Sequence, residues 1–215
     1  VMGIAIQGVL EDFYNKELWK GQHENLEKML VDMVRQRFSE ELQRNYVDWK
    51  QAPSWEELLT ICEDGVKNYM KTMKAHKLLG PYAKSEVKLK GKLGDIKIAG
   101  KVDFLIQRSD TGVTILDGKN SKIKMKYVDP DQLRYYGLVF TRQYGQMPDR
   151  LGFVWYRYPY DAEEGEEGVD WIEFTRRDLV SLGERAVAAR QGMLRGEFEA
   201  RPKAKHCRWC DYESV

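Results

Sequence analysis

The stretch of sequence that decides the fold reads Val113-Thr114-Ile115-Leu116-Asp117-Gly118-Lys119. Its apolar run, residues 113–116, is typical of a buried strand. The alternation of side chains along a strand places Asp117 and Lys119 on one face. An earlier run, Ile98-Ala99-Gly100-Lys101-Val102-Asp103-Phe104, carries a second acid at Asp103. We expect the two strands to pair as an antiparallel hairpin, which brings Asp103 close to Asp117.

Two carboxylates and a lysine on neighbouring strands suit one kind of chemistry. Paired carboxylates can grip a hard cation such as Mg²⁺, and a cation held in this way activates water and neutralises charge on a phosphate. A lysine beside the cation can orient that water or stabilise the developing negative charge. The alternative is an ordinary solvated strand edge, because Asp-x-Lys occurs by chance in many surface strands.

A helix is predicted directly after these strands. Asp129 is placed to cap it, Pro130 suits its first position, and Gln132 stands where a capping box would place an amide. Gln132 and Tyr136 are four residues apart, so they share one helical face. The alternative interpretation is that Gln132 only closes the cap and that Tyr136 packs in the core.

The order of these motifs resembles a known nuclease family. The motifs follow one another as Gly100-x-x-Asp103, Asp117-x-Lys119 and Gln132-x-x-x-Tyr136. This order resembles the RecB/AddB-type branch of the PD-(D/E)XK nucleases, which also contains the CRISPR-associated RecB-like nucleases. The resemblance implies a restriction-endonuclease-like α/β fold, in which a mixed sheet is flanked by helices and preceded by a helical region.

The resemblance also assigns a role to each motif residue. The metal ligands that it implies, for Mg²⁺ or Mn²⁺, are Asp103, Asp117 and the backbone carbonyl of Gly118. Lys119 would be the catalytic lysine of such a site. Gln132 and Tyr136 match the motif that the family associates with single-stranded DNA.

One position departs from the family pattern. Family members often carry a metal-binding histidine on the first helix in a Gly-x-x-x-His pattern, whereas Gly3 is followed by Gln7 at this spacing. Gln7 is the expected ligand there, although an amide oxygen is a weaker ligand. Glu11 lies one turn further along the same face and is an alternative source of a carboxylate.

The three cysteines fall into two groups. Cys62 belongs to an apolar stripe at helical intervals, so we expect it in the core. Cys207 and Cys210 form a Cys-x-x-Cys pair directly after His206. Family members often carry a [4Fe–4S] cluster, and the resemblance implies that Cys207 and Cys210 are two of its ligands. A zinc site that includes His206 is the rival interpretation, and an uncommitted surface pair is a third.

The charge of the chain is balanced but unevenly distributed. It has 35 Lys and Arg against 34 Asp and Glu, a net charge of +1. Basic residues crowd the first two strands, at Lys84, Lys88, Lys90, Lys92, Lys97 and Lys101. Such residues near a metal site would attract a phosphate backbone, whereas the alternative is a merely solvated lysine face. Glu86, which alternates with Lys88 and Lys90, is interpreted as exposed.

The remaining pattern predicts one nuclease domain over residues 1–215. A helical part covers residues 1–80, a sheet core with the active site covers 81–176, and a last helix with the cysteine tail covers 177–215. Charges interrupt every apolar run, so no segment is expected to cross a membrane. No secretory leader is recognisable, which favours a cytoplasmic protein of bacterial, archaeal or phage origin.

The resemblance, with the strand-face argument as independent support, implies a metal-dependent DNA nuclease. We expect an exonuclease that acts on single-stranded or unwound DNA in recombination, repair or phage replication. DNA would be its main partner, and a helicase or a recombination protein would be a further one. The alternative function is a noncatalytic nucleic-acid-binding module that retains the nuclease fold.

Overall fold

The computed structural model describes residues 1–20, 25–45, 47, 53–124 and 128–197. The helices are α1 (Met2–Asn15), the 3-10 helix η1 (Leu18–Lys20), α2 (Leu26–Arg44), α3 (Trp55–Ala75), α4 (Pro130–Tyr144) and α5 (Arg176–Leu194). The strands are β1 (Ala83–Leu93), β2 (Ile96–Arg108), β3 (Gly112–Lys119), β4 (Arg150–Trp155), β5 (Tyr160–Asp161), β6 (Glu166–Glu167) and β7 (Val169–Ile172). Helices precede the sheet and one helix interrupts it, as the sequence predicts.

Five strands form one mixed sheet in the order β1-β2-β3-β4-β7. Neighbouring strands are antiparallel except for β3 and β4, which run parallel and are joined through α4. The predicted hairpin of β2 and β3 is present, and its last ladder pair joins Phe104 to Leu116. The next residues of the two strands are Asp103 and Asp117, so the two acids lie where this ladder ends.

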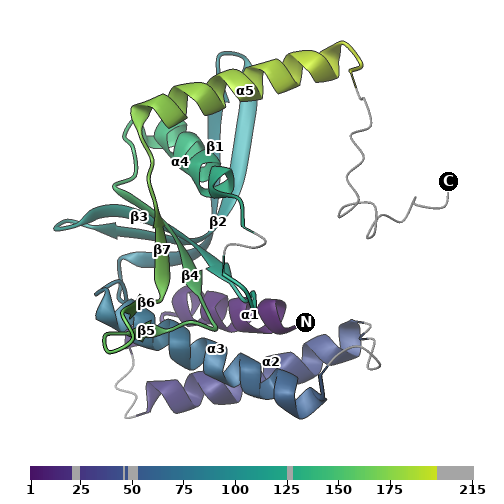
Figure 1. The fold of residues 1–215 in the computed structure, drawn as a ribbon, viewed down its shortest axis with the longest axis vertical. Coiled ribbons are helices and arrows are strands. Elements are labelled where there is room, and N and C mark those ends of the chain that lie inside the picture. Colours follow the sequence, from purple (N-terminus) through teal and green to yellow (C-terminus); the bar gives the residue numbers. More distant parts are fainter. Residues whose placement is uncertain (21–24, 46, 48–52, 125–127, 198–215) are drawn as a thin grey trace.

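The two faces of the sheet carry separate apolar cores. Helices α1, α2 and α3 cover one face, and α4 and α5 cover the other (Figure 1). On β3, Ile115 packs in the core beneath α4, whereas its neighbour Leu116 packs in the core beneath α1 to α3. Both faces of β3 are therefore buried, which explains why its sequence is a continuous apolar run.

The hairpin of β1 and β2 changes its buried face partway along. On β2, Val102 packs in the core of α4, whereas Phe104 packs in the core of α1 to α3. Residues two apart on a regular strand share a face, so the exchange marks a local distortion at Asp103. The facing residue on β1, Glu86, has a left-handed φ of 57°. The ladder lacks a pair at this point, between Ser85–Phe104 and Val87–Val102.

The ends of several elements follow from local sequence. Ser54 and Asp129 cap α3 and α4 by accepting hydrogen bonds from backbone N–H groups of the first helical turn. Helix α1 ends at Asn15, and Glu17, two residues later, adopts a left-handed φ of 52°.

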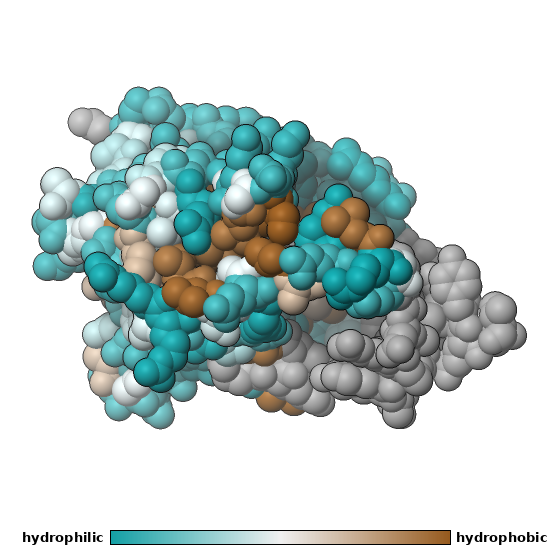
Figure 2. All heavy atoms as spheres, turned by 90° about the horizontal axis from the view of Figure 1, so that it is seen from above, coloured by the Kyte–Doolittle hydropathy of each residue, from teal (hydrophilic) through white to brown (hydrophobic). Residues whose placement is uncertain are grey.

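The face that carries α5 exposes apolar side chains. Seen from above in Figure 2, apolar residues gather in a hollow with polar residues around it. A groove of about 500 Å³ lies on α5 beside the turn between β1 and β2, and its apolar lining includes Leu93, Leu179, Val180 and Val187. Among the described residues, no helix is long and apolar enough to cross a membrane.

Candidate active site

Asp103, Asp117 and Lys119 lie together where β2 and β3 separate. The Asp103 carboxylate accepts a hydrogen bond from the backbone N–H of Gly118, with a distance of 2.8 Å between Oδ2 and the nitrogen. The Nζ atom of Lys119 lies 2.5 Å from Oδ2 of Asp117. The structure thus brings together the two acids and the lysine that the strand pattern selected.

Gln132, in the first turn of α4, reaches both residues of the Asp-x-Lys motif. Its Nε2 donates to Oδ1 of Asp117 at 3.1 Å, and its Oε1 accepts from Nζ of Lys119 at 3.2 Å. The same Nε2 lies 3.2 Å from the hydroxyl of Tyr136. The Gln132 side chain therefore does not serve the helix cap, where Asp129 accepts the hydrogen bond instead.

Tyr136 is half-buried between α4 and β2. A Cβ atom at Gly100 would lie 3.0 Å from the Tyr136 ring, so the absence of a side chain at Gly100 lets the ring approach the strand. Burial raises the pKa of the Tyr136 hydroxyl, against the opposing effect of its hydrogen bond to Gln132. The hydroxyl therefore stays protonated and available as a donor near the two acids.

Burial raises the pKa of both carboxyl groups. For Asp103 the pKa rises to about 7, chiefly because of burial and then because of the negative charge of Asp117. The Asp117 side chain is 5% exposed, and burial raises its pKa in spite of the neighbouring Lys119. Two acids in this environment hold their charge at a cost, so the site favours an additional cation.

A chain of contacts leads from Gly118 to the first helix. A Cβ atom at Gly118 would lie 1.9 Å from the Tyr156 hydroxyl, so only glycine leaves room for that hydroxyl. Tyr156 donates to Oε1 of Gln7 at 2.7 Å, and Nε2 of Gln7 donates to Oε1 of Glu86 at 2.9 Å. The structure thus connects Gln7 to the site, with both ends of its amide engaged.

Glu86 is the site residue that the sequence interpretation missed. Its side chain is only 12% exposed, forms an ion pair with Lys101, and contributes to the raised pKa of Asp103. The interpretation of Glu86 as exposed is wrong because its left-handed backbone breaks the alternation of the strand. One signal was available, since Glu86 is the sole acid in the lysine-rich sequence of β1.

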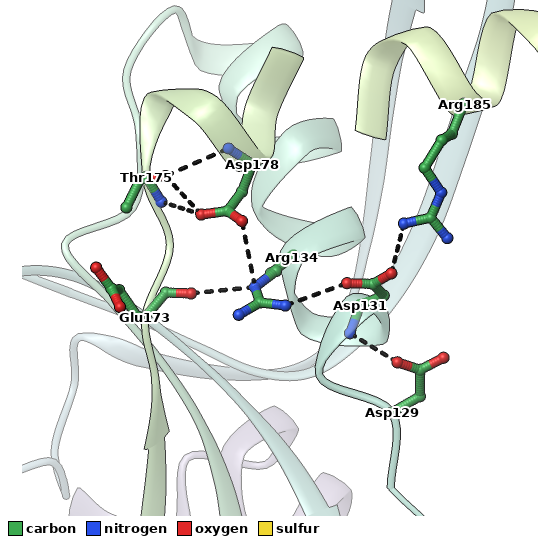
Figure 3. Close-up of polar contacts among 7 residues, drawn as sticks. All are labelled: Asp129, Asp131, Arg134, Glu173, Thr175, Asp178 and Arg185. Carbon is green, nitrogen blue, oxygen red and sulfur yellow. Dashed lines mark hydrogen bonds and ion pairs between the residues drawn. The ribbon is translucent and has the colours of Figure 1, made fainter. Parts of the chain in front are cut away.

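A polar network fixes the turn of α4 that carries the site glutamine (Figure 3). Arg134 donates to the backbone carbonyl of Glu173 and to Oδ1 of Asp131, each at 3.2 Å. Its Nε also lies 3.7 Å from Oδ1 of Asp178 on α5. Arg185 of α5 binds the second carboxylate oxygen of Asp131. These contacts tie the start of α4 to α5 and to the segment after β7.

Of the three cysteines, only Cys62 lies among the residues that the structure describes. Cys62 is fully buried in the core of α1 to α3, as predicted, and burial raises its pKa to about 12. Cys207, Cys210 and the neighbouring His206 lie outside the described residues. The predicted cluster ligands therefore stay a prediction from sequence.

The amino-acid sequence matches a protein family that has this arrangement of acids, lysine and mixed sheet. The family described as the PD-(D/E)XK nuclease superfamily matches residues 1–215. The chain belongs to the PD-(D/E)XK nuclease superfamily. The predicted fold class of this nuclease is thereby confirmed, with its mixed sheet flanked by helices and its helical region at the start.

Two solved structures resemble this nuclease at low sequence identity. The first is a candidate exonuclease from Eubacterium rectale, with 16% identity, a TM-score of 0.47 and coverage of 97% of this chain and 87% of that chain. The second is the protein SSO0001, with 15% identity, a TM-score of 0.40 and coverage of 97% of this chain and 94% of that chain. No curated protein sequence matches this nuclease.

The donor atoms of the site fit the divalent metals that this superfamily generally uses. Oδ2 of Asp117 is buried and, among the described residues, has an ionic contact with Lys119 but no aligned hydrogen-bond donor. Oxygen donors suit Mg²⁺ and Mn²⁺. Within the described part of the chain, no three acidic, histidine or cysteine side chains form a ready-made cation cluster. Mg²⁺ does not need one, because it commonly binds one or two carboxylates together with water and substrate phosphate.

Proposed function

We propose that this nuclease is a Mg²⁺- or Mn²⁺-dependent deoxyribonuclease that acts as an exonuclease on single-stranded or unwound DNA. The observation that carries the proposal is the pair formed by the partly buried Asp103 and the buried Asp117, with Lys119 beside it. Buried acids that lack a full complement of positive charge are costly to a fold. Their presence in one site is explained if they serve to bind a cation.

Each residue at the meeting point of β2 and β3 has a proposed task. Asp103, Asp117 and the backbone carbonyl of Gly118 are the proposed metal ligands. A divalent cation held there would lower the pKa of a bound water and neutralise charge on the scissile phosphate. Lys119, held by Gln132, keeps its ammonium beside these ligands, where it can orient the attacking water or donate to a phosphate oxygen.

The α4 side of the site is the proposed contact with the DNA strand. Gln132 bonds both Asp117 and Lys119, so it sets their relative position. The Tyr136 hydroxyl lies at the end of this chain of bonds and remains protonated. We assign Gln132 and Tyr136 to orienting the strand end above the metal ligands.

The α1 side of the site departs from the expected direct ligand at Gln7. Both ends of the Gln7 amide are engaged, by Tyr156 and by Glu86, so we propose that Gln7 acts through Glu86 as a positioning residue. Glu86 adds negative charge close to Asp103. This charge would raise the affinity for a cation where other members of the resembled branch use a histidine.

Cleavage of labelled DNA tests the proposed function. The protein, Asp117→Ala and the exposed control Asp95→Ala are incubated with end-labelled single- and double-stranded DNA in Mg²⁺, Mn²⁺ or EDTA. We expect metal-dependent cleavage that Asp117→Ala loses and Asp95→Ala keeps, with a product ladder typical of exonuclease action. DNA binding without cleavage in any metal would instead identify a noncatalytic module.

Calorimetric titration with Mn²⁺ tests the role of Glu86 independently of activity. Glu86→Gln should weaken Mn²⁺ binding several-fold, because the variant removes one negative charge beside Asp103. Glu184→Gln, which changes an exposed acid on α5, is the matched control and should bind Mn²⁺ like the wild type. Equal weakening in both variants would indicate a general charge effect and would refute a specific role for Glu86.

A finer placement in the RecB/AddB-type branch rests on the order of the motifs and on Cys207 and Cys210. We propose these cysteines as two ligands of a [4Fe–4S] cluster, and a helicase or recombination protein as a working partner. Anaerobic purification followed by absorbance spectroscopy and metal analysis tests the cluster. A broad visible absorbance with bound iron supports it, whereas bound zinc without that absorbance contradicts it.

A further inference from the structure

The outer face of the β1–β2 hairpin consists almost entirely of lysine. In the register of the two strands, Lys88 lies opposite Lys101, Lys92 lies opposite Lys97, and Lys90 lies opposite Ala99. All of these residues are exposed. We call this surface the lysine face, defined by Lys88, Lys90, Lys92, Lys97 and Lys101.

The inner face of the same hairpin is clamped to α4. Leu89 and Ile98 are buried there, and Gly91 and Gly100 let the helix approach closely. A Cβ atom at Gly91 would lie 2.7 Å from Cβ of Arg142 on α4. Figure 1 shows the hairpin rising from the sheet along α4 toward α5. This packing fixes the lysine face outward, away from α4.

The lysine face does not stabilise the folded protein. Like charges directly opposite each other on paired strands are destabilising. Lys101 forms an ion pair with Glu86, whereas no ion pair of the other four lysines is found among the described residues. A row of positive charges of this kind is explained if it binds an anionic chain.

A groove adjoins Lys101 of the lysine face and, through Gln7 and Glu86, the edge of the candidate active site. It has a volume of about 440 Å³ and lies between α1 and the base of the hairpin, where Gln7, Glu86 and Lys101 contribute to its lining. Ile4, which is 53% exposed, also lines it and offers an apolar contact. Small-ligand pockets commonly have volumes of about 300 to 1,000 Å³, so a groove of this size suits one or two unpaired nucleotides.

We infer that the lysine face binds the phosphate backbone of single-stranded DNA and directs its end through this groove to the metal ligands. The inference rests on the proposed function and names the path of its substrate. Lys88 and Lys92 are separated by about 13 Å at roughly 3.3 Å per residue of strand. A strand within a duplex advances roughly 3.4 Å per nucleotide and an unpaired strand is more extended, so this length spans at most about four nucleotides.

Fluorescence anisotropy in EDTA tests the lysine face without any cleavage. A labelled oligothymidylate is titrated with the wild type, with the face variant (Lys88→Gln, Lys90→Gln, Lys92→Gln, Lys97→Gln) and with a control variant that loses the same charge on α2 and α3 (Lys28→Gln, Lys67→Gln, Lys71→Gln, Lys74→Gln). The face variant should bind at least about tenfold more weakly at low salt. The slope of log affinity against log salt should fall by about 3, at roughly 0.7 per lost phosphate contact.

Two further readouts separate this inference from the proposed function. The face variant should melt at the wild-type temperature or above it, because like-charge repulsion is relieved, and should keep its Mn²⁺ affinity. Wild-type affinity in the face variant, or an equal loss in the control variant, would overturn the inference. If the wild type binds DNA through the lysine face but cleaves no DNA, the proposed function fails while the assignment of the lysine face to DNA binding stands.

Discussion

The base and the outer part of the β1–β2 hairpin carry opposite charges in opposite environments. At the base, Glu86 and Asp103 are largely buried, and burial with the charge of Asp117 raises the pKa of Asp103 to about 7. In the outer part, Lys88 and Lys92 are exposed and face other lysines. The same two strands therefore hold negative charge where water is excluded and positive charge where it is not.

The difference teaches how one hairpin can serve two partners. Buried acids attract a compact cation strongly, because the low local dielectric constant weakens the attraction between opposite charges less than water does. Exposed lysines attract a long anionic chain weakly at each contact, and salt screens every contact. The exchange of the buried face at Glu86 and Asp103 separates the two environments. Changes confined to the base should therefore alter chemistry, and changes confined to the lysine face should alter binding.

Outside the proposed metal ligands, the largest effect is expected for Lys119→Met. Cleavage should slow by roughly a hundred- to a thousandfold, because a preorganised donor beside the reacting phosphate is lost. Mn²⁺ affinity should not fall, because the variant removes a competing cation from Asp117. Calorimetry with Mn²⁺ and single-turnover cleavage measure the two quantities. Lys122→Met, in the loop after β3, is the control, and a wild-type rate in Lys119→Met would remove this residue from the mechanism.

The pH dependence of stability is a second test of the base. The pKa of Asp103 is 3.8 ordinarily and about 7 in the folded protein, so the folded state holds more protons between these values. The free energy of unfolding of the metal-free protein should therefore fall as pH rises from about 4 to 7, by about 4 kcal/mol from this group. Thermal melts in EDTA should show a weaker pH dependence for Asp103→Asn. If Asp103→Asn showed the same pH dependence of stability as the wild type, the assigned burial of Asp103 would be contradicted.

A smaller effect is expected where α4 contacts the base. Gln132→Ala removes a donor to Asp117 and a partner of Lys119, which should lower the cleavage rate about tenfold. The pKa of Asp117 should rise further, so the pH–rate profile should move to higher pH. Gln191→Ala, on the exposed side of α5, serves as the control. A profile unmoved by Gln132→Ala would show that the amide is not coupled to the acid.

The smallest effect is expected for Arg134→Ala, which acts on the base from a distance. The variant loses partly exposed contacts to Asp131, Asp178 and the Glu173 carbonyl, so stability should fall by about 1 kcal/mol. Cleavage should slow only a few-fold, and binding of DNA by the lysine face should be unchanged. Thermal melts and anisotropy measure these quantities, with Arg190→Ala as control. A large loss of DNA binding would show that the two regions are not separable.

Much of the fold could be predicted because its signals are local. The apolar run before Asp117, the caps at Ser54 and Asp129, and the short turn before β3 each depend on neighbouring residues alone. The pairing of Asp103 with Asp117 also follows from a short hairpin and from alternation along two strands. These parts of the site are encoded within about twenty residues of sequence, which is the range that periodicity can cover.

The rest of the site depends on contacts between distant residues. Gln7 meets Glu86 and Tyr156 only after α1, β1 and β4 have packed, so no spacing in the sequence reveals their hydrogen bonds. Glu86 escaped prediction for a second reason, because its left-handed backbone turns the side chain away from the alternating pattern. The direction of the lysine face likewise depends on how Gly91 and Gly100 admit α4.

Single-turnover cleavage of labelled single-stranded DNA over a range of protein concentrations most directly tests whether the metal site and the lysine face have separate roles. The account predicts that Asp117→Asn stays inactive at every concentration in Mg²⁺. It also predicts that the face variant (Lys88→Gln, Lys90→Gln, Lys92→Gln, Lys97→Gln) cleaves slowly at low concentration and approaches the wild-type rate at saturation. Cleavage by Asp117→Asn, or a face variant that stays slow at saturation, would contradict the separation of metal chemistry from strand binding.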